Sequence, residues 1–214
     1  MEEKIVAYKN NLYQVLSKLT KGLGSEKRLE ILNALLHGAK TVDAIAKVTG
    51  LSVANTSRHL QVLKEGALVV TTREGNFIRY RLASKKIAEL LLLLCHVGEE
   101  QLTDMRVIEN DYDQEIAVRK VELDEALEMA KDDKAVLLDV RPFEEFESGH
   151  LPNAVNLPMD EFESQKYKLP IEKTIIVYCR GRLCGYANLA AKDLQELGYD
   201  TYSLNRSFSD WKWG

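Results

Sequence analysis

Residues 175–187 read IIVYCRGRLCGYA, and this stretch decides the fold of the second half of the chain. It begins as an apolar run typical of a buried strand and continues from Gly185 with a pattern typical of a helix. Between the two lies a short loop that carries Cys179 and Cys184. A loop that leaves a parallel strand and enters a helix lies at the carboxyl edge of the sheet, where open α/β folds bind ligands. We therefore expect a functional site at this loop.

Strand-like and helix-like segments alternate around the loop. Strands are expected at 118–121, 135–139, 154–157, 174–178 and 201–204, and helices from Leu123, from Pro142 and over 185–197. Alternation of this kind predicts an α/β domain with a parallel sheet and helices on both faces.

The first half has a mainly helical pattern. Helical spacing and caps predict helices over 5–20, 25–38, 41–50 and 52–66, and a last helix over 84–109. Two alternating runs, 67–72 and 77–82, flank Glu74, Gly75 and Asn76, which are typical of a hairpin turn. This order predicts a mainly α winged helix-turn-helix with a β-hairpin wing. We expect a DNA-binding and dimerisation domain at 1–108, an acidic linker at 109–116 and the α/β domain at 117–214.

Length and charge agree with two domains of different character. The 214 residues suffice for two cores of roughly 100 residues each. Residues 1–100 contain 15 Lys+Arg and 10 Asp+Glu, whereas residues 101–214 contain 14 and 23. The first half can therefore approach a polyanion, and the second half would be repelled by one.

The sequence also indicates a compartment. The start, MEEKIVAYKNN, is acidic and lacks the basic-then-apolar layout of a secretory signal. The longest apolar run, 90–95, is far shorter than the roughly 20 residues of a spanning helix. In a reducing compartment, the three cysteines would be reactive or buried rather than paired in structural bridges. We expect a cytoplasmic protein that contacts no membrane.

Residues 53–64 are expected to form the helix that reads DNA. Thr56, Leu60 and Leu63 share one helical face and would lie in the core. The outward set is small, polar and cationic, as suits a major groove, and consists of Ala54, Asn55, Ser57, Arg58 and Gln61. On the wing, cations that can reach phosphates or the minor groove are Arg73, Arg79 and Arg81. The alternative for Arg58 and Gln61 is an ordinary solvated face.

This half resembles the ArsR family of bacterial repressors. The resemblance covers roughly the first 100 residues and is carried by GLSVANTSRHLQVLKEGALV at 50–69 and TTREGNFIRYRL at 71–82. It implies a homodimer, formed by the first and last helices, that binds a palindromic double-stranded operator. The run LLLLLC at 90–95 also favours a dimer, because one apolar face would stay uncovered in a single copy.

Metal binding is not expected. Many ArsR relatives sense metals through cysteines on the third helix, which here reads TVDAIAKV at 41–48 and has no cysteine. Cys95 and His96 are adjacent, so they point about 100° apart on a helix, a poor start for a shared ligand set. Cys95 is expected to be an inert buried residue, with a redox thiol as the alternative. We expect no metal and no cofactor.

The loop after residue 178 has features that activate a thiol. Its backbone N–H groups can converge on one point, backed by the positive end of a helix dipole. These features predict a Cys179 thiolate that attacks an outer sulfur atom and becomes a persulfide. Arg180 and Arg182 are expected to steer in a small sulfur anion such as thiosulfate or a persulfide donor, and Gly181 permits the turn. The anion-binding loop would comprise Arg180, Gly181, Arg182, Leu183, Cys184 and Gly185.

Residues 118–214 resemble the rhodanese domain of sulfurtransferases. The resemblance is carried by LLDVRPFEEFESGHLPNAVNLP at 137–158, by the loop stretch 175–187 and by YSLNRSFSDWKWG at 202–214. It implies sulfurtransferase activity at Cys179, and a bracing role for Asp139 and Arg141. Asn153 replaces a usual glycine, and Asn tolerates a left-handed turn nearly as well.

Two roles remain open for Cys184. It can be a small polar residue that points at the backbone of its own loop. Alternatively, it resolves the persulfide on Cys179, releasing sulfide and forming a disulfide, provided that the curved loop lets the sulfurs approach to roughly 2 Å.

The two halves together favour a DNA-binding transcriptional regulator, a repressor by resemblance, whose Cys179 couples sulfur chemistry to DNA binding. The alternative is a sulfurtransferase enzyme that uses its winged-helix half for dimerisation or partner docking. A third reading is a repressor whose second half binds an anion without reacting.

Overall fold

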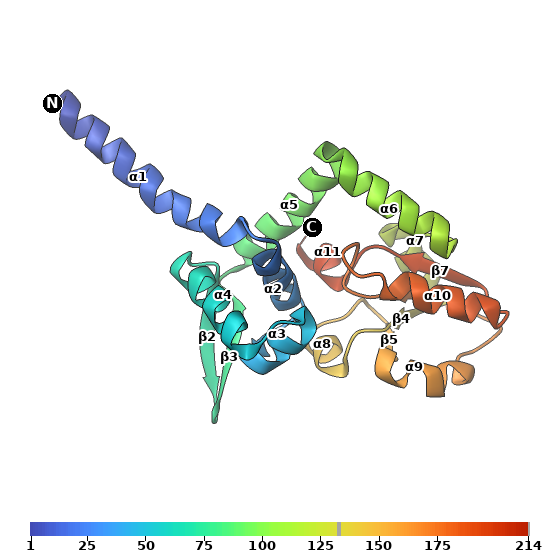
Figure 1. Ribbon diagram of the computed structural model, residues 1–214. Helices are drawn as coiled ribbons and strands as arrows, with labels where there is room; N and C mark the ends of the chain where they lie inside the picture. Colours follow the sequence, from blue (N-terminus) through green and yellow to red (C-terminus); the bar gives the residue numbers. More distant parts are fainter. Residues whose placement is uncertain (132–133, 214) are drawn as a thin grey trace. The chain divides into compact units, whose positions relative to one another are not determined.

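A computed structural model describes residues 1–131 and 134–213. The chain forms two compact units, Met1–Leu91 and Leu92–Gly214 (Figure 1). The division falls inside helix α5 (Lys85–Gln101), so this helix belongs to both units.

The first unit is a winged helix-turn-helix, as predicted. Its helices are α1 (Glu2–Leu23), α2 (Glu26–Leu36), α3 (Val42–Thr49), α4 (Val53–Glu65) and the start of α5. Its strands β1 (Lys40–Thr41), β2 (Val69–Glu74) and β3 (Phe77–Leu82) form an antiparallel sheet in the order β1-β3-β2. Strand β1 was not predicted, because a pair of residues has too little alternation to be recognised.

Local signals in the sequence position α4. The Thr41 hydroxyl accepts a hydrogen bond from the N–H of Ala44 at 3.3 Å and caps α3. Gly50 ends α3 with φ +64°, a left-handed conformation that favours glycine. Ser52 then caps α4 by accepting from the N–H of Asn55 at 3.3 Å. These caps confirm the predicted helix boundaries.

The core of the first unit holds one face of α4. As predicted, Thr56, Leu60 and Leu63 are fully buried. Apolar residues of several elements surround this face, among them Ile31, Leu32, Leu35, Ile45, Leu68, Val69 and Leu91. The opposite face of α4 is consequently turned to solvent.

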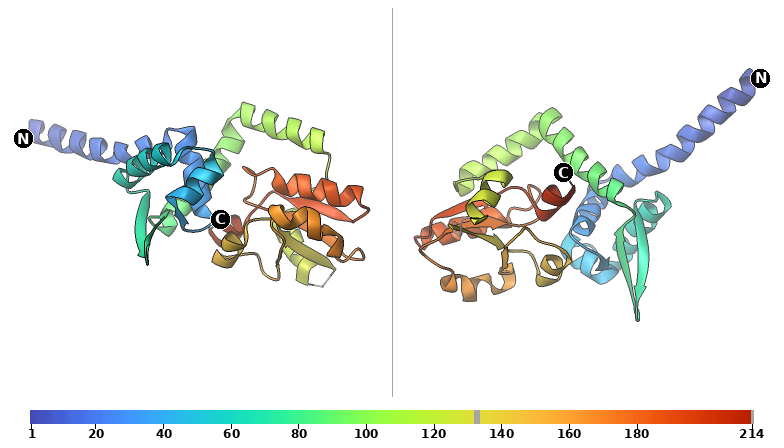
Figure 2. Two further views of the ribbon diagram at one scale, coloured as in Figure 1. Left: turned by 60° about the horizontal axis from the view of Figure 1, so that its bottom comes forward. Right: turned by 180° about the vertical axis from the view of Figure 1, so that it is seen from behind.

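Helix α1 carries apolar side chains that its own unit leaves uncovered. Its N-terminal part extends away from the other helices of the unit (Figure 2). Its large apolar residues with more than half of their surface exposed are Ile5, Val6, Tyr8, Leu12, Tyr13, Val15 and Leu16. On α5, Leu93 is 58% exposed. An isolated copy therefore leaves apolar surface in water on both helices.

The second unit is an α/β domain preceded by two helical segments. Its sheet has the order β5-β4-β6-β7 and is parallel throughout, as predicted. The strands are β4 (Ala135–Asp139), β5 (Val155–Asn156), β6 (Thr174–Tyr178) and β7 (Thr201–Leu204). The helices are the end of α5, α6 (Thr103–Ile116), α7 (Leu123–Lys131), α8 (Phe143–Ser148), α9 (Met159–Gln165), η1 (Lys166–Lys168), α10 (Tyr186–Glu196) and α11 (Phe208–Trp213).

Alternate residues of β6 face opposite sides of the sheet, and both sides are covered. Ile175 and Val177 pack on one side with residues of α9 and α10. Ile176 and Tyr178 pack on the other side with residues of α7. The prediction of helices on both faces is confirmed.

Three segments differ from the predictions. The expected strand at 118–121 makes a single bridge, between Lys120 and Ser203, because helix α7 begins immediately afterwards. The expected helix at 84–109 is interrupted at Leu102, whose backbone is extended at φ −98° and ψ 102°. Neither Gly nor Pro marks this break. Residues 109–116, predicted as a linker, form the second half of α6. In addition, the short helices α9, η1 and α11 were not predicted.

In the part of the chain that the structure describes, no helix has the length and apolar character needed to cross a membrane.

Candidate functional site

Cys179 lies at the carboxyl end of the central strand β6. It follows Tyr178 directly, packs with apolar residues of α10 and is only 2% exposed. The loop 180–185 then leads into α10. Gly181 has φ +81°, so the predicted need for glycine at this turn is confirmed. The sheet thus places Cys179 at the floor of the loop.

The two cysteines of the loop are in contact. The Sγ atoms of Cys179 and Cys184 lie 2.7 Å apart, and both residues are free thiols. The hydrogen bond from Cys179 lowers the pKa of Cys184 to about 6, and the backbone N–H groups of Tyr186 and Arg180 act in the same direction. The amides of the loop therefore converge on the sulfur of Cys184.

That Cys179 attacks as a thiolate stays a prediction, and the contact with Cys184 bears on it. The hydrogen bond to Cys184 and the burial of the site raise the pKa of Cys179 well above its ordinary value. The contact and nearby backbone N–H groups lower the pKa of Cys184, so they favour Cys184 as the place for a negative charge shared by the pair. Sequence reasoning assigned the convergent amides to Cys179, and the backbone N–H of Arg180 does act on the pKa of both cysteines.

Arg180 does not extend toward the solvent as an anion-steering residue. Its Nε and Nη2 donate to the two carboxylate oxygens of Glu145 at 2.9 and 2.8 Å. The Glu145 side chain is 2% exposed. Burial opposes the charge of Arg180, but the Glu145 carboxylate outweighs it and raises the pKa of Arg180. Arg180 therefore ties the start of the loop to Glu145 on α8, and its predicted role in steering an anion stays a prediction.

Arg182 contacts two carboxylates that come from the helices preceding the α/β fold. Its Nε lies 3.2 Å from an oxygen of Glu99 on α5, and its Nη1 lies 3.5 Å from an oxygen of Glu109 on α6. These glutamates were not predicted as site residues. Their only sequence signal was the acidic character of this part of the chain, which is equally typical of a solvated helix.

Helix α6 also contacts the end of the loop. The hydroxyl of Tyr112 donates to the backbone oxygen of Gly185 at 2.9 Å. A Cβ atom at position 185 would lie 2.4 Å from that hydroxyl, so glycine is required for this contact. Next to it, the Asn188 amide on α10 donates to Asp113 at 3.4 Å. The segment predicted as a linker thus packs on the loop that holds the cysteine pair (Figure 1).

Asp139 and Arg141 form the predicted brace. Arg141 Nε and Nη2 donate to the Asp139 carboxylate at 2.9 and 2.5 Å, and both side chains are fully buried. Arg141 Nη2 also donates to the backbone oxygen of Gly149 at 2.9 Å. Asn153, which replaces a usual glycine, has φ +60°, as expected. The pair ties the end of β4 to the loop that follows α8.

Asp139→Ala is expected to lower the free energy of unfolding of the Leu92–Gly214 unit by about 3–5 kcal/mol, because it leaves the Arg141 charge buried and unpaired. Urea denaturation followed by circular dichroism measures this change. The matched control is Glu128→Ala, which removes a pair with Lys131 whose side chains are 69% and 64% exposed and is expected to cost less than about 1 kcal/mol. Equal losses in the two variants would contradict the bracing role.

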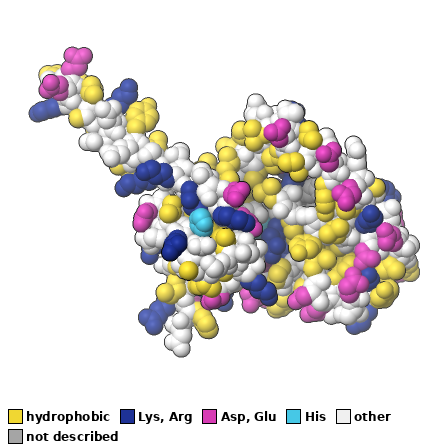
Figure 3. Space-filling model, in the orientation of Figure 1, with side chains coloured by type: hydrophobic (Ala, Val, Ile, Leu, Met, Phe, Trp, Pro, Cys, Tyr) yellow, Lys and Arg dark blue, Asp and Glu magenta, His cyan; other side chains and the backbone are white. Residues whose placement is uncertain are grey.

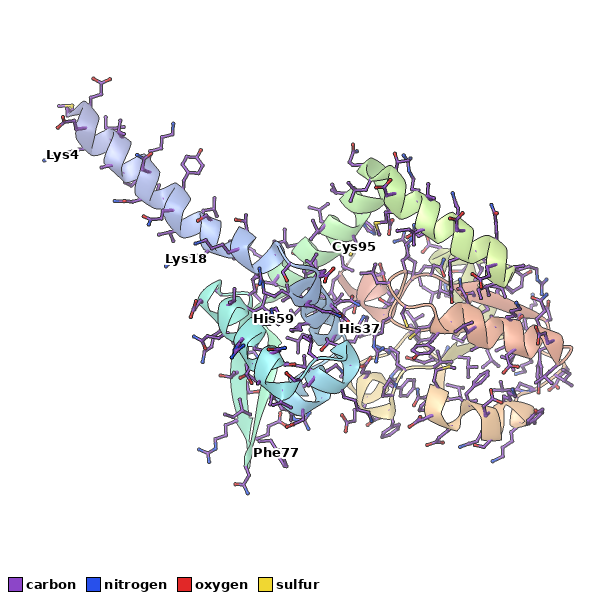
Figure 4. The ribbon with its side chains drawn as sticks, viewed as in Figure 1. Lys4, Lys18, His37, His59, Phe77 and Cys95 are labelled. Atoms are coloured by element: carbon purple, nitrogen blue, oxygen red, sulfur yellow. The ribbon has the colours of Figure 1, made fainter. Side chains whose placement is uncertain are left out.

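Three further residues lie near this site. The Ser207 N–H and hydroxyl donate to Asp210 at 2.7 and 2.6 Å, and Asp210 in turn lies against Gly181. Cys95 on α5 is half-buried (Figure 4), and burial together with Glu99 raises its pKa. A raised pKa disfavours the alternative in which Cys95 is a redox thiol.

The first unit exposes the residues expected to read DNA. All five outward residues of α4 are exposed, namely Ala54, Asn55, Ser57, Arg58 and Gln61. On the wing, Arg73 and Arg81 are exposed, whereas Arg79 pairs with Glu74 at 2.7 Å. Figure 3 shows Lys and Arg side chains over the helices and the hairpin of this unit, and Figure 4 places Phe77 at the tip of the hairpin.

The first unit is a winged helix-turn-helix that exposes polar and cationic side chains on one helix. The second is an α/β domain with a cysteine loop at the edge of its sheet. Together they define a regulator with a rhodanese-like domain. Residues 25–70 match the bacterial regulatory protein arsR family, and residues 122–213 match the rhodanese-like domain. The chain is 34% identical over 203 residues to the HTH-type transcriptional regulator Rv0324 of Mycobacterium tuberculosis, which covers 94% of this chain and 88% of that protein. It therefore belongs to the arsR family of transcriptional regulators and carries a rhodanese-like domain.

Other relatives match one half each. The HTH-type transcriptional regulator CmtR of Mycobacterium bovis is 35% identical over 114 residues, which are 53% of this chain and 89% of CmtR. Thiosulfate sulfurtransferase GlpE of Coxiella burnetii is 34% identical over 89 residues, which are 41% of this chain and 81% of GlpE. A solved winged helix-turn-helix DNA-binding domain from Mycobacterium bovis is 38% identical with a TM-score of 0.43, and the match covers 45% of this chain and 89% of that domain.

Proposed function

We propose that this regulator takes up sulfane sulfur on Cys179 and that this covalent change alters its affinity for DNA. The contacts that most support the proposal join the cysteine loop to the helices before it. Arg182 contacts Glu99 on α5, and Gly185 contacts Tyr112 on α6. Helix α5 belongs to both compact units, so a change in the loop acts on a helix that the DNA-binding unit shares. The segment 109–116 then serves as a coupling element between domains 1–108 and 117–214.

The DNA-binding half of the proposal rests on α4 and the wing. Exposed Arg58 and Gln61 offer donors for base edges, while Arg73 and Arg81 offer charge for phosphates. The exposed apolar faces of α1 and α5 support a homodimer, which would bind a palindromic double-stranded operator. Because the proposed partner is DNA, we propose that this protein acts in the cytoplasm.

The sulfur chemistry uses the cysteine pair as a unit. Cys184 takes the proton of Cys179, and the Cys179 thiolate attacks the outer sulfur of a persulfide R–S–SH. The donor S–S bond breaks as the new one forms, and the electron pair leaves on R–S⁻. The products are Cys179–S–SH, protonated Cys184 and R–S⁻, so charge and protons balance. The 2.7 Å contact supports this proton transfer, because the sulfurs need no rearrangement to exchange the proton.

The same contact supports Cys184 as the resolving thiol. After it loses its proton, Cys184 can attack the Sγ of Cys179 and release HS⁻. The sulfane sulfur is reduced to sulfide and the two thiols are oxidised to a disulfide, so no further oxidant is needed. The loop would thereby release the added sulfur as sulfide and keep a disulfide between Cys179 and Cys184.

Sulfur loading is expected to depend on pH through Cys184. Below pH about 6 Cys184 is protonated and cannot take the proton of Cys179, so the loading rate should fall as the pH falls through this value. In Cys184→Ser the inflection should move to the titration of Cys179 itself, above about 8.5. Initial loading rates measured by intact mass between acidic and alkaline pH check this. An inflection at the same pH in both proteins would contradict the role of Cys184.

The direct test of the sulfur proposal is mass spectrometry of the intact protein after incubation with glutathione persulfide. The proposal expects a gain of one sulfur atom, located on the peptide that contains Cys179. Cys95→Ser serves as the control, because Cys95 lies on α5 outside the loop, and it should load like the unsubstituted protein. A gain located on Cys95 alone would overturn the proposal.

A further inference from the structure

We infer that Glu99 and Glu109 select the sulfur donor of the Cys179 loop: they disfavour the thiosulfate dianion and leave persulfides as the substrate class. The inference rests on the proposed function, because it names the donor for the same site. It concerns residues that lie before the rhodanese-like match at 122–213 and so belong to this chain rather than to the isolated domain.

The cations of the loop are already held by carboxylates. Arg180 makes a two-point contact with Glu145, whose side chain is 2% exposed. Arg182 lies between Glu99 and Glu109, whose side chains are 14% and 28% exposed. An incoming anion that needs Arg182 must first displace these two carboxylates.

The backbone N–H groups of the loop act on its own sulfurs. Those of Tyr186 and Arg180 lower the pKa of Cys184, and that of Arg180 also acts on Cys179. Asp210 adds a further carboxylate beside Gly181, and Arg206 lies 3.7 Å from it. Arg182 therefore lies between Glu99 and Glu109, and Asp210 adds a third carboxylate beside the turn at Gly181.

The two donor classes differ in how much positive charge they require. Thiosulfate carries two negative charges, and its reaction expels sulfite as a dianion: Cys179–S⁻ attacks the outer sulfur, the S–S bond breaks and sulfite leaves with the electron pair. A thiol persulfide is neutral or singly charged and expels a thiolate. Like charges repel more strongly where the side chains are partly buried, as those of Glu99 and Glu109 are, so the carboxylates penalise thiosulfate more than a persulfide.

The test compares both donors on full-length Glu99→Gln/Glu109→Gln and on the unsubstituted protein. The measured quantity is the ratio of the Cys179 loading rate with thiosulfate to that with glutathione persulfide, each obtained by intact mass under the same conditions. The double variant is expected to raise this ratio roughly 10- to 100-fold, because Arg182 becomes available to the dianion. Adding Arg182→Gln to the double variant should abolish the gain.

A matched control removes the same charge from the same two helices. Glu100 on α5 and Asp111 on α6 are exposed, and Glu100→Gln/Asp111→Asn should leave the ratio unchanged.

Salt provides a second measurement. Thiosulfate loading of the unsubstituted protein should become faster as ionic strength rises, because screening weakens the repulsion. Thiosulfate loading of the Glu99→Gln/Glu109→Gln variant should instead become slower, because screening weakens the attraction to Arg182.

Three outcomes would decide against the inference. An equal ratio in the two double variants, or an equal rise for both donors, would mean that the glutamates merely brace the helices. A higher rate with thiosulfate than with the persulfide in the unsubstituted protein would contradict the assigned donor class. Failure of both donors to load Cys179 in any variant would instead overturn the proposed function.

Discussion

Cys179→Ser is expected to abolish sulfur loading and every response of DNA binding to a sulfur donor. A serine hydroxyl cannot form a persulfide, so the loss should be on the order of 10³-fold or more. The substitution should leave the fold intact, because serine is close in size to the buried cysteine that it replaces at the end of β6. Intact mass after treatment with glutathione persulfide measures the loss.

Cys184→Ser provides the matched control within the same loop. It should still gain one sulfur atom, but roughly 10-fold more slowly at neutral pH, because only a small fraction of Cys179 is then a thiolate. It should also keep the persulfide, since no second thiol is present to resolve it. Loading of Cys179→Ser at the rate of Cys184→Ser would show that Cys184 is the acceptor and would reverse the assignment.

Arg58→Ala is expected to weaken specific DNA binding by roughly 10- to 100-fold in the dimer, because each copy loses a cationic contact in the groove. Arg58 is exposed on the face of α4 opposite to Thr56, Leu60 and Leu63, so its removal should not disturb the core. Fluorescence anisotropy with a fragment selected by the protein from a random DNA library measures the change at fixed salt concentration.

The control for this variant is Lys131→Ala, which removes one positive charge from exposed helix α7 of the second unit. It should leave DNA affinity unchanged. The same loss of affinity in both variants would indicate that only net charge matters, and an unchanged affinity in Arg58→Ala would remove α4 from the DNA contact.

The elements closest to both sites were predictable because their signals are local. Strands β4, β6 and β7 have the predicted bounds, since each is a buried apolar run that ends at a polar residue or turn. Helix α4 was predictable from the Ser52 cap and from the helical spacing of its three core residues. The position of Cys179 followed from the strand and helix on either side of the loop.

The charge state of the loop was not predictable in the same way. The distance between Cys179 and Cys184 depends on how tightly residues 180–183 curve, which the sequence does not encode in any pattern of polarity. Once the sulfurs touch, the two thiols titrate as a pair, and the backbone N–H groups of the loop act on the pKa values of both. Sequence reasoning could name both residues but not divide the roles between them.

The contribution of α5 and α6 was missed for a related reason. The stretch ENDYDQE at 109–115 has the composition of a linker, and its helical character depends on tertiary contacts. Tyr112 contacts Gly185, and Ile116 is buried. Glu109 lies 73 residues from its partner Arg182, and contacts at such separations leave no trace in local spacing.

The most direct test of the central claim is the DNA affinity of one protein preparation before and after loading, with the added sulfur counted by mass in the same sample. The account predicts that the dissociation constant for the selected fragment changes by about 5- to 150-fold on loading of the unsubstituted protein. It predicts no change for Cys179→Ser treated identically. Equal affinities of the loaded and unloaded protein would contradict the coupling of sulfur uptake to DNA binding.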